Sequence, residues 1–426
     1  MSTEKYKSIL LITYYWPPSG GPGVQRQLKF AKYLSKLGHR VIVYTPENGE
    51  YPSIDKSLFA DIPKNVTVIK RKIFEPYKLF KKLSGRKKVI NPNVLNEKKE
   101  NGLLHHLSIW IRGNLFIPDA RILWVKPSVK YLTKYLKKNH IDTVITSGPP
   151  HSLHLIGLKL KEKHKLKWIA DFRDPWTEVD YFNQLLLTKK ALLKHIKLEK
   201  KTIETADLCI TVTESWKRNL KKLGAKNVEC IHNGYDEEDF KAYRNLSQPE
   251  NKFIISHVGQ IFKNRNYEVF WKAISEIINE DKNLKNSLSI QFIGTLDESV
   301  FDSIKKYKLS SYFTHINNIP HSKIPKHLLT SHLLYLPLDN TKQAQGKIPA
   351  KFFEYIASEN HILVLSDNST EIETLDTSNT HFFNTSSNSL PDLKQKIQDC
   401  YHQKPSKFNY IYFSRLEATK RLVNFL

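Results

Sequence analysis

The sequence is poor in cysteine and has no long apolar run. Its 426 residues include three cysteines, and none of them forms a C-x-x-C pair. This pattern argues against a disulfide framework or a structural zinc site and suits a reducing compartment. The longest apolar-rich run near the amino terminus has about nine residues, which is too short to span a bilayer. We therefore expect a soluble or peripheral protein.

Several catalytic signatures are also missing. The sequence contains no G-x-x-x-x-G-K-[ST], which excludes a P-loop nucleotidase, and neither H-E-x-x-H nor G-x-S-x-G. It has no D-x-D either, which argues against the metal-dependent, single-domain sugar transferases. We predict no metal site.

Acidic residues are scarce in the first half of the chain. Residues 1–245 hold 46 Lys+Arg and 24 Asp+Glu, a balance of +22, whereas residues 246–426 hold 21 and 18, a balance of +3. The asymmetry indicates an anionic partner for the first half, either nucleic acid or a membrane surface. A lysine-rich codon usage would explain the total of +25 equally well, but not the nearly neutral second half.

Short apolar runs of strand length alternate with helical patterns in both halves. This alternation predicts an α/β protein with two doubly wound, Rossmann-like domains. The strands expected in the first half are Ser8–Tyr15, Arg40–Thr45, Val66–Ile69, Thr143–Thr146, Trp168–Asp171, Leu208–Val212 and Val228–Ile231. Those expected in the second half are Phe253–Val258, Ser289–Ile293, His332–Leu336 and Ile362–Leu365.

A polar stretch over residues 241–251 is the expected linker. The predicted domains are residues 1–245 and 246–410, followed by an amphipathic helix in residues 411–426. Lys70–Lys138 breaks the pattern of the first domain with 18 Lys/Arg and four acids around apolar clusters. This basic insertion would suit a membrane surface, or its apolar face would pack on its own domain.

Two segments have the composition of an anion site. Gly20 and Gly21 lie in a loop between a strand and a helix, where backbone N–H groups can hold a diphosphate, although a tight turn would need the same residues. The second segment begins at Gly346 and continues into a helix with Lys351 and Glu354 on one stripe. A lysine at a helix start favours an anion, and a carboxylate one turn later can accept hydrogen bonds from a ribose. The alternative is a surface helix with a Lys351–Glu354 ion pair.

The order of motifs resembles the retaining glycosyltransferases of family 4 along nearly the whole chain. This resemblance implies the GT-B fold, in which two Rossmann-like domains face each other across a cleft and the C-terminal helix crosses back to the first domain. The matching segments are Gly20-Gly21, Leu37–Val41, Asp171–Trp176, Thr202–Ile210, Ile231–Asp236, His257–Gly259, Arg265-Asn266 and the helix around Glu354.

The resemblance also implies roles for single residues. Gly259 opens the donor domain, Arg265 would contact the donor diphosphate, and Glu354 would bind the ribose hydroxyls, with Lys351 neutralising phosphate beside them. Arg173 and Asp174 would face the reaction centre as the catalytic pair. A structural ion-pair cluster at the end of a strand is the alternative for Asp171 and these two residues.

Two positions depart from the family pattern. Its E-x7-E motif would place an acid at Gly346, and a Gly-Arg pair at the start of the second domain is Gly259-Gln260 here. The first departure leaves the donor sugar open, and the second leaves Arg265 as the basic residue of that motif.

We therefore predict a metal-independent, retaining glycosyltransferase of the hexosyltransferase type. It would use a nucleoside-diphosphate sugar as co-substrate, without a cofactor, and a glycan or polyprenyl-linked acceptor. We expect it in the cytoplasm, peripheral on the anionic inner membrane leaflet. We expect no nucleic-acid partner. The alternatives are a sugar-nucleotide epimerase of the same fold and a basic nucleic-acid-binding protein, although the sequence has no nucleic-acid recognition motif.

Overall fold

The computed structural model describes residues 6–75, 103–179, 182–339, 346–367, 371–375, 382–385, 389–405 and 410–426. It divides into two compact units, one comprising residues 1–232 with 418–426 and the other comprising residues 233–417. Residues 233–245 thus belong to the second unit, and so does the polar stretch over 241–251. None of the described helices combines the length and apolar character needed to cross a bilayer.

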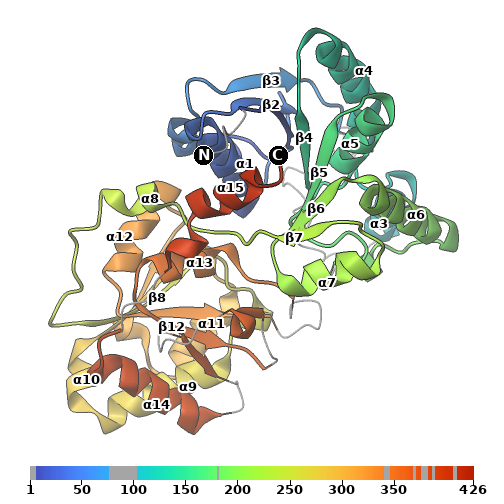
Figure 1. Ribbon diagram of the computed structural model, residues 1–426. Helices are drawn as coiled ribbons and strands as arrows, with labels where there is room; N and C mark the ends of the chain where they lie inside the picture. The colour runs from blue at the N-terminus through green and yellow to red at the C-terminus, as the bar shows by residue number, and fades with distance from the viewer. Residues whose placement is uncertain are drawn as a thin grey trace. The chain divides into compact units, whose positions relative to one another are not determined.

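The first unit contains a parallel sheet with the strand order β3-β2-β1-β4-β5-β6-β7. Its strands are β1 (Ser8–Ile12), β2 (Arg40–Pro46), β3 (Thr67–Arg71), β4 (Thr143–Gly148), β5 (Lys167–Phe172), β6 (Leu208–Thr211) and β7 (Val228–Cys230). Its helices are α1 (Pro22–Lys36), α3 (Leu103–Leu115), α4 (Ile122–Lys138), α5 (Ser152–Lys163), α6 (Lys189–Thr205) and α7 (Glu214–Lys222) (Figure 1).

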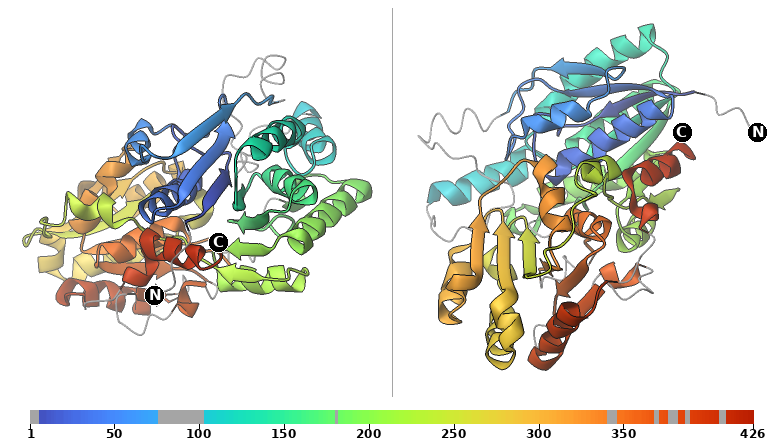
Figure 2. Two further views of the ribbon diagram at one scale, coloured as in Figure 1. Left: turned by 45° about the horizontal axis from the view of Figure 1, so that its top comes forward. Right: turned by 90° about the vertical axis from the view of Figure 1, so that its left-hand side faces the viewer.

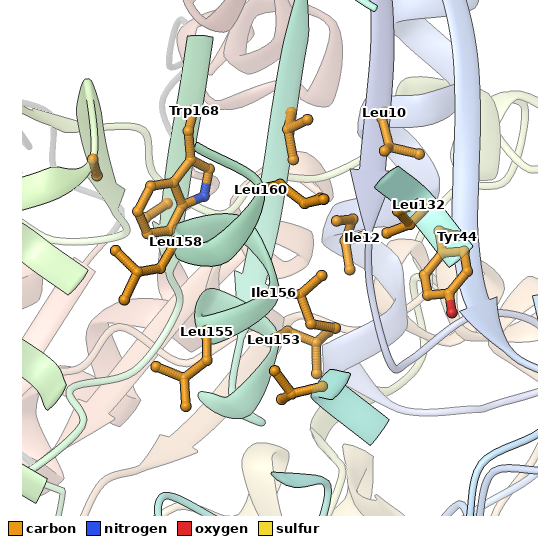
Figure 3. Packing of buried hydrophobic residues seen from close by; sticks show 14 of the residues in the cluster. Leu10, Ile12, Tyr44, Leu132, Leu153, Leu155, Ile156, Leu158, Leu160 and Trp168 are labelled. Carbon is orange, nitrogen blue, oxygen red and sulfur yellow. The ribbon is translucent and has the colours of Figure 1, made fainter. Parts of the chain in front are cut away.

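Strand β1 shows why this sheet needs helices on both faces. Leu10 and Ile12 point into a core shared with α4 and α5, whereas Ile9 and Leu11 point into a second core shared with α1. Successive side chains of a strand alternate between the two faces, so a continuous apolar strand requires cover on both. Figure 3 shows the first of these cores, with Leu153 of α5 among its members. The second also contains Ala418 and Leu422 of helix α15 (Arg415–Val423).

The second unit contains a parallel sheet with the order β10-β9-β8-β11-β12-β13 (Figure 2). Its strands are β8 (Phe253–Val258), β9 (Leu288–Ile293), β10 (Phe313–Ile316), β11 (Leu333–Pro337), β12 (His361–Leu365) and β13 (Phe382–Thr385). Its helices, besides the start of α15, are α8 (Glu237–Lys241), α9 (Glu268–Glu280), α10 (Lys282–Ser287), α11 (Glu298–Lys306), α12 (Ile324–Leu329), α13 (Ala350–Ala357) and α14 (Leu390–His402).

The predicted α/β class with two doubly wound parallel sheets is confirmed. Of the basic insertion, α4 packs its apolar face on its own unit through Trp124, Val129 and Leu132. Residues 76–102 of the insertion, with its clustered lysines and arginines, lie outside the described residues. The packing alternative therefore holds for α4.

Candidate active site

In the first unit, the strand order reverses between β1 and β4, and open α/β sheets bind ligands outside such a point. Arg173, directly after β5, bridges the first turn of α1 and the loop after β4 there. Its Nη1 donates to the Gly23 carbonyl at 3.2 Å, and its Nη2 donates to the Pro149 carbonyl. The guanidinium also lies 5.7 Å from the centroid of the Tyr15 ring. Arg173 is thus a cation held in place by backbone carbonyls at the edge of the sheet.

Asp171 forms a buried ion pair with Arg26 of α1, with at most 1% of either side chain exposed. Arg26 Nε and Nη2 each donate to the carboxylate at 3.0 Å, and Gln27 Nε2 donates to it at 2.5 Å. Arg26 Nη1 donates to the Ile231 carbonyl at 2.8 Å. For Asp171 the structure therefore shows the ion-pair alternative, with Arg26 as the partner.

The remaining predicted residues of the first unit lie close to the same edge. Asp174 follows Arg173 and is partly buried. Gly20 donates its N–H to the Ser53 carbonyl at 2.9 Å. Gly21 is exposed and is the N-cap of α1, with φ at 85°, a conformation that favours glycine. The Gly20 N–H is already bonded within the protein, whereas Gly21 is open to solvent.

His154 of α5 is buried beside these loops. Trp168 Nε1 donates to the Thr146 hydroxyl at 2.9 Å, which leaves that hydroxyl to donate to His154 Nδ1, also at 2.9 Å. Burial, reinforced by nearby positive charge, keeps the pKa of His154 well below its usual value. His154 is therefore a neutral packing residue.

In the second unit, the strand order reverses between β8 and β11, and a cation lies there. Gly259 follows β8 with φ at 118°, and a Cβ added to it would lie 2.5 Å from Lys351 Nζ. The Lys351 ammonium thus lies against the backbone at the carboxyl end of β8. A side chain at position 259 would be strained and would displace it.

The neighbours of Lys351 fix its direction and its charge. Its Nζ lies 3.4 Å from His257 Nε2, and His257 Nδ1 lies 2.9 Å from the Tyr335 carbonyl. His257 must donate from Nδ1 to that carbonyl, so Nε2 offers a lone pair to the ammonium. Burial, together with the charge of Arg265, lowers the pKa of Lys351 to about 7. The protonation of Lys351 near neutral pH therefore depends on the charge of the groups next to its ammonium.

Arg265 ends a short 3₁₀ helix, η3 (Lys263–Arg265), and pairs with Asp339, two residues beyond β11. Its Nε donates to Asp339 Oδ1 at 2.9 Å, and its Nη2 donates to the other oxygen. Burial would raise the pKa of Asp339, but this pairing brings it below its usual value. Within the described part of the chain, Arg265 Nη1 has no hydrogen-bond partner, so the aspartate orients the guanidinium and leaves one edge open.

Glu354 lies one turn after Lys351 on α13 and accepts a hydrogen bond from His321 Nε2 at 2.8 Å. Burial would raise the pKa of Glu354, but His321, Arg415 and Lys351 bring it below its usual value. Among the described residues Lys351 and Glu354 do not form the ion pair considered from the sequence, because each bonds to a different imidazole. Both side chains are partly buried, so each is held at the edge of the sheet.

Gly346 lies in the turn before α13, which begins at Ala350 with Pro349 as its N-cap. Lys347 is close enough to Asp339 to lower the pKa of that carboxyl. Three cations therefore gather at the switch point of the second sheet: Arg265, Lys347 and Lys351.

The model of the Glycosyltransferase Family 4 matches residues 23–239, just over half of the chain. The chain belongs to this family. The match begins in α1 and covers strands β2 to β7 of the first sheet, with the residues around Arg173 and Asp174. Family membership makes the protein a glycosyltransferase.

Solved structures extend the likeness in fold over nearly the whole family 4 chain. Sucrose-phosphate synthase from Thermosynechococcus elongatus is 13% identical with a TM-score of 0.57, over 99% of this chain and 94% of that one. WaaG, a glycosyltransferase involved in lipopolysaccharide biosynthesis, is 13% identical with a TM-score of 0.53, over 98% and 95%. A putative UDP-N-acetylglucosamine 2-epimerase from Listeria monocytogenes is 11% identical with a TM-score of 0.56, over 98% and 95%. No curated protein matches the chain.

The sequence-based site of this glycosyltransferase divides between the units. Gly20, Gly21, Arg173 and Asp174 belong to the first unit, whereas Gly259, Arg265, Gly346, Lys351 and Glu354 belong to the second. Within the second unit, the structure brings Gly259, Arg265 and Lys351 together.

Sequence reasoning missed the partners of these residues, namely His257, His321 and Asp339. Asp339 follows a strand that the sequence predicts, and the carboxyl ends of parallel strands gather at one edge, so its position was a usable signal. His257 stands in a segment that resembles the family, but its direction depends on the Tyr335 carbonyl of a neighbouring strand. Nothing in the sequence around His321 points to Glu354.

Proposed function

We propose that this glycosyltransferase transfers a hexose from a nucleoside diphosphate to a glycan or lipid-linked acceptor, with retention of configuration and without a metal ion. The observation that carries the proposal is the cation cluster at the switch point of the second sheet, formed by Arg265 and Lys351 next to the start of α13. A diphosphate gains charge as the glycosidic bond breaks, and fixed cations stabilise that charge.

Each residue of the cluster has a distinct part in donor binding. Arg265, oriented by Asp339, would direct its free Nη1 to the diphosphate. Lys351 would add a second cation, and its ammonium would be favoured once phosphate oxygens replace solvent. Glu354, a carboxylate with a lowered pKa, would accept the ribose hydroxyls. Since the fixed cations neutralise the leaving group, we propose that the reaction needs no metal.

Arg173 and Asp174 of the first unit are the proposed reaction-centre residues. Two backbone carbonyls hold the Arg173 guanidinium at the switch point of the first sheet. There it could interact with a developing negative charge or with an oxygen of the acceptor. The acceptor side would then be the unit with the larger positive charge.

The positive charge of the first half of the chain supports a further part of the proposal. We propose that the enzyme binds the anionic cytoplasmic leaflet and acts there on a polyprenyl-linked acceptor. Residues 1–245 carry the balance of +22, and each Lys or Arg near an anionic bilayer contributes about 1 kcal/mol to binding. The clustered Lys81, Lys82, Arg86, Lys87 and Lys88 lie outside the described residues. Their joint replacement by Gln tests this segment, by sedimentation with anionic vesicles at low salt and at about 0.5 M salt.

The experiment that tests the function is a screen of nucleotide sugars, read out by melting temperature and by release of the nucleoside diphosphate. A donor that binds the folded state raises the melting temperature in proportion to its affinity. We expect one sugar nucleotide to stabilise the protein and oligonucleotides to leave it unchanged. Stabilisation by oligonucleotides alone would instead support the nucleic-acid-binding alternative.

Two additions separate the remaining alternatives. Excess EDTA should leave turnover unchanged, and a loss of turnover that Mg²⁺ or Mn²⁺ restores would contradict the metal-independent mechanism. Incubation with the donor and no acceptor should leave the sugar configuration intact. Conversion of the sugar nucleotide to its epimer under these conditions would support the epimerase alternative, since the putative UDP-N-acetylglucosamine 2-epimerase from Listeria monocytogenes is similar in fold.

A further inference from the structure

The first half of helix α6 buries polar side chains and exposes aliphatic ones. The buried positions of the whole helix are Ala191, His195, Glu199, Thr202 and Ile203, three of them polar, whereas a soluble amphipathic helix buries its apolar stripe. The exposed fractions of its outward apolar residues are 66% for Leu193, 45% for Ile196 and 39% for Leu192. The outward face of α6 therefore presents aliphatic side chains among its lysines, in a position where water would favour polar groups.

Two of the inward polar residues, His195 and Glu199, are hydrogen-bonded, and these bonds fix the orientation of the helix. Trp176 Nε1 donates to His195 Nδ1 at 3.1 Å, and the Thr177 hydroxyl donates to Glu199 at 2.6 Å. Rotating α6 to bury its leucines would break both bonds and leave buried polar groups unpaired, which is costly. The apolar face is thus held outward by the hydrogen bonds of the opposite face.

Helix α3 extends the same face. Its Asn114 Oδ1 accepts from the Thr188 N–H, at the N-cap of α6, at 2.8 Å, and its Nδ2 donates to the Leu186 carbonyl at 3.1 Å. The two helices are therefore joined (Figure 1). Further apolar side chains exposed around this junction are Leu107 (49%), Trp110 (39%), Leu115 (62%) and Leu186 (45%). Leu186 has φ at 51°, a strained value for a leucine.

The charge of this face has one sign. Residues 103–118 and 182–198 contain five Lys/Arg and no Asp or Glu. Lys189, Lys190, Lys194 and Lys197 are exposed on α6, and none forms an ion pair with an acid in the described part of the chain. Further along the helix, Lys200 and Lys201 do pair with acids. Exposed aliphatic side chains among unpaired lysines match the boundary between anionic headgroups and acyl chains.

We infer that the α3–α6 surface, formed by α3, residues 186–188 and the first half of α6, docks on an anionic lipid bilayer. Leu193, Ile196 and Trp110 insert at the headgroup–acyl boundary, while the lysines of α6 lie among the lipid phosphates. The inference rests on the membrane part of the proposed function and assigns it to a particular surface. Leucines predominate over aromatic rings here, which favours acyl chains over stacked bases as the ligand.

The test is co-sedimentation of the full chain with vesicles, either of phosphatidylcholine or of equal parts phosphatidylcholine and phosphatidylglycerol. We expect the wild type to bind the anionic vesicles and to stay in solution with the neutral ones. Leu193→Gln with Ile196→Gln should lower the partition coefficient more than about tenfold, because two inserted aliphatic side chains return to water.

A charge-matched pair of variants separates this surface from net charge. Replacing Lys189, Lys190, Lys194 and Lys197 by Gln should weaken binding by about fivefold for each lysine. Replacing four lysines on α4 removes the same charge from the same unit and should change binding less than about fivefold in total. These control lysines, all exposed, are Lys130, Lys134, Lys137 and Lys138.

The outcomes keep the two proposals apart. If the wild type binds anionic vesicles and both α6 variants bind equally well, the α3–α6 surface is wrong and membrane association stands. If the wild type does not sediment with anionic vesicles, the proposal of membrane association is itself wrong. If the Leu193/Ile196 variant instead converts a dimer to a monomer in light scattering, the surface joins copies of the chain and the inference is overturned. Unchanged circular dichroism and donor-induced stabilisation confirm that each variant is folded.

Discussion

Each unit places an arginine–aspartate pair near the carboxyl edge of its sheet, and the two pairs differ in burial. Arg26 and Asp171 are at most 1% exposed, whereas Arg265 is 28% and Asp339 16% exposed. All three guanidinium nitrogens of Arg26 donate to the protein, since Nε and Nη2 bond to Asp171 and Nη1 bonds to two backbone carbonyls. The buried pair fixes α1 against the end of β5. The half-open pair, Arg265 and Asp339, instead orients a guanidinium that is partly exposed to solvent and to a ligand. The same two residue types thus form a structural pair in one unit and a partly exposed pair, proposed to bind the donor, in the other.

Breaking the buried pair should have the largest effect, and it should be on stability. Asp171→Asn leaves the Arg26 guanidinium buried without a counter-charge, which costs about 3–5 kcal/mol in the free energy of unfolding. Urea unfolding measures the loss. The comparison is Asp339→Asn in the second unit, where the pair is partly exposed and its loss should cost less, about 1 kcal/mol. Equal losses in the two variants would erase the distinction drawn between the pairs.

Breaking the half-open pair should act on donor affinity instead. Arg265→Ala, and separately Glu354→Ala, should weaken donor binding by about 1.5–3 kcal/mol, as for hydrogen bonds to charged groups. Titration calorimetry with the sugar nucleotide found in the screen gives the affinity, and circular dichroism checks the fold. Donor affinity unchanged in both variants would contradict the placement of the donor in the second unit.

The pH dependence of donor binding sharpens the comparison, because the second edge holds a lysine that titrates near neutrality. With its pKa at about 7, Lys351 loses its proton as the pH rises, and a diphosphate diester does not change charge there. Donor affinity should therefore fall above pH 7, by up to about tenfold per pH unit. Lys351→Arg should remove this slope, whereas Lys347→Arg should keep it.

The same pKa predicts the opposite trend for stability without donor. Since the pKa of Lys351 is lowered from 10.5 to about 7 in the folded protein, the unfolded chain binds more protons between these values. Stability contributed by this site therefore rises with pH across that window. Unfolding curves of the wild type and Lys351→Gln should diverge in this direction, and parallel curves would show that the lysine is not buried.

The smallest effect is expected at His321, which acts through Glu354. His321→Ala should weaken donor binding by about 0.5–1.5 kcal/mol, because the carboxylate loses the hydrogen-bond donor that orients it. His321→Gln, which retains a donor, should recover part of the loss. No recovery, or a loss as large as that of Glu354→Ala, would mean that His321 contacts the ligand itself.

Most of the fold could be predicted because buried parallel strands are continuous apolar runs. All eleven expected strands form, whereas β10 and β13 were missed. Strand β10, Phe313–Ile316, is short and lies at the edge of its sheet, with Thr314 and His315 exposed. One-sided edge strands lack the apolar continuity that identifies the central ones. Strand β13, Phe382–Thr385, lies at the opposite edge.

The site could be predicted only as far as local periodicity extends. The spacing of Lys351 and Glu354 placed them on one stripe of a helix, and the structure holds both at the sheet edge. Their imidazole partners come from segments far away in the chain, so no local pattern reveals them. Helix α6 shows the limit most clearly, because it buries the hydrogen-bonded side chains of His195 and Glu199 while Leu193 and Ile196 are exposed.

The return of the chain to the first unit has a consequence for its biosynthesis. Ala418 and Leu422 belong to a core that also contains Ile9 and Leu28, and about 400 residues separate these two groups along the chain. On the ribosome, domains fold as they emerge, but this hydrophobic core lacks two members until nearly the whole chain has been made. The second unit, whose residues 233–417 are contiguous, can close before the first is complete. The half synthesised first therefore cannot complete its core until the second half has been made.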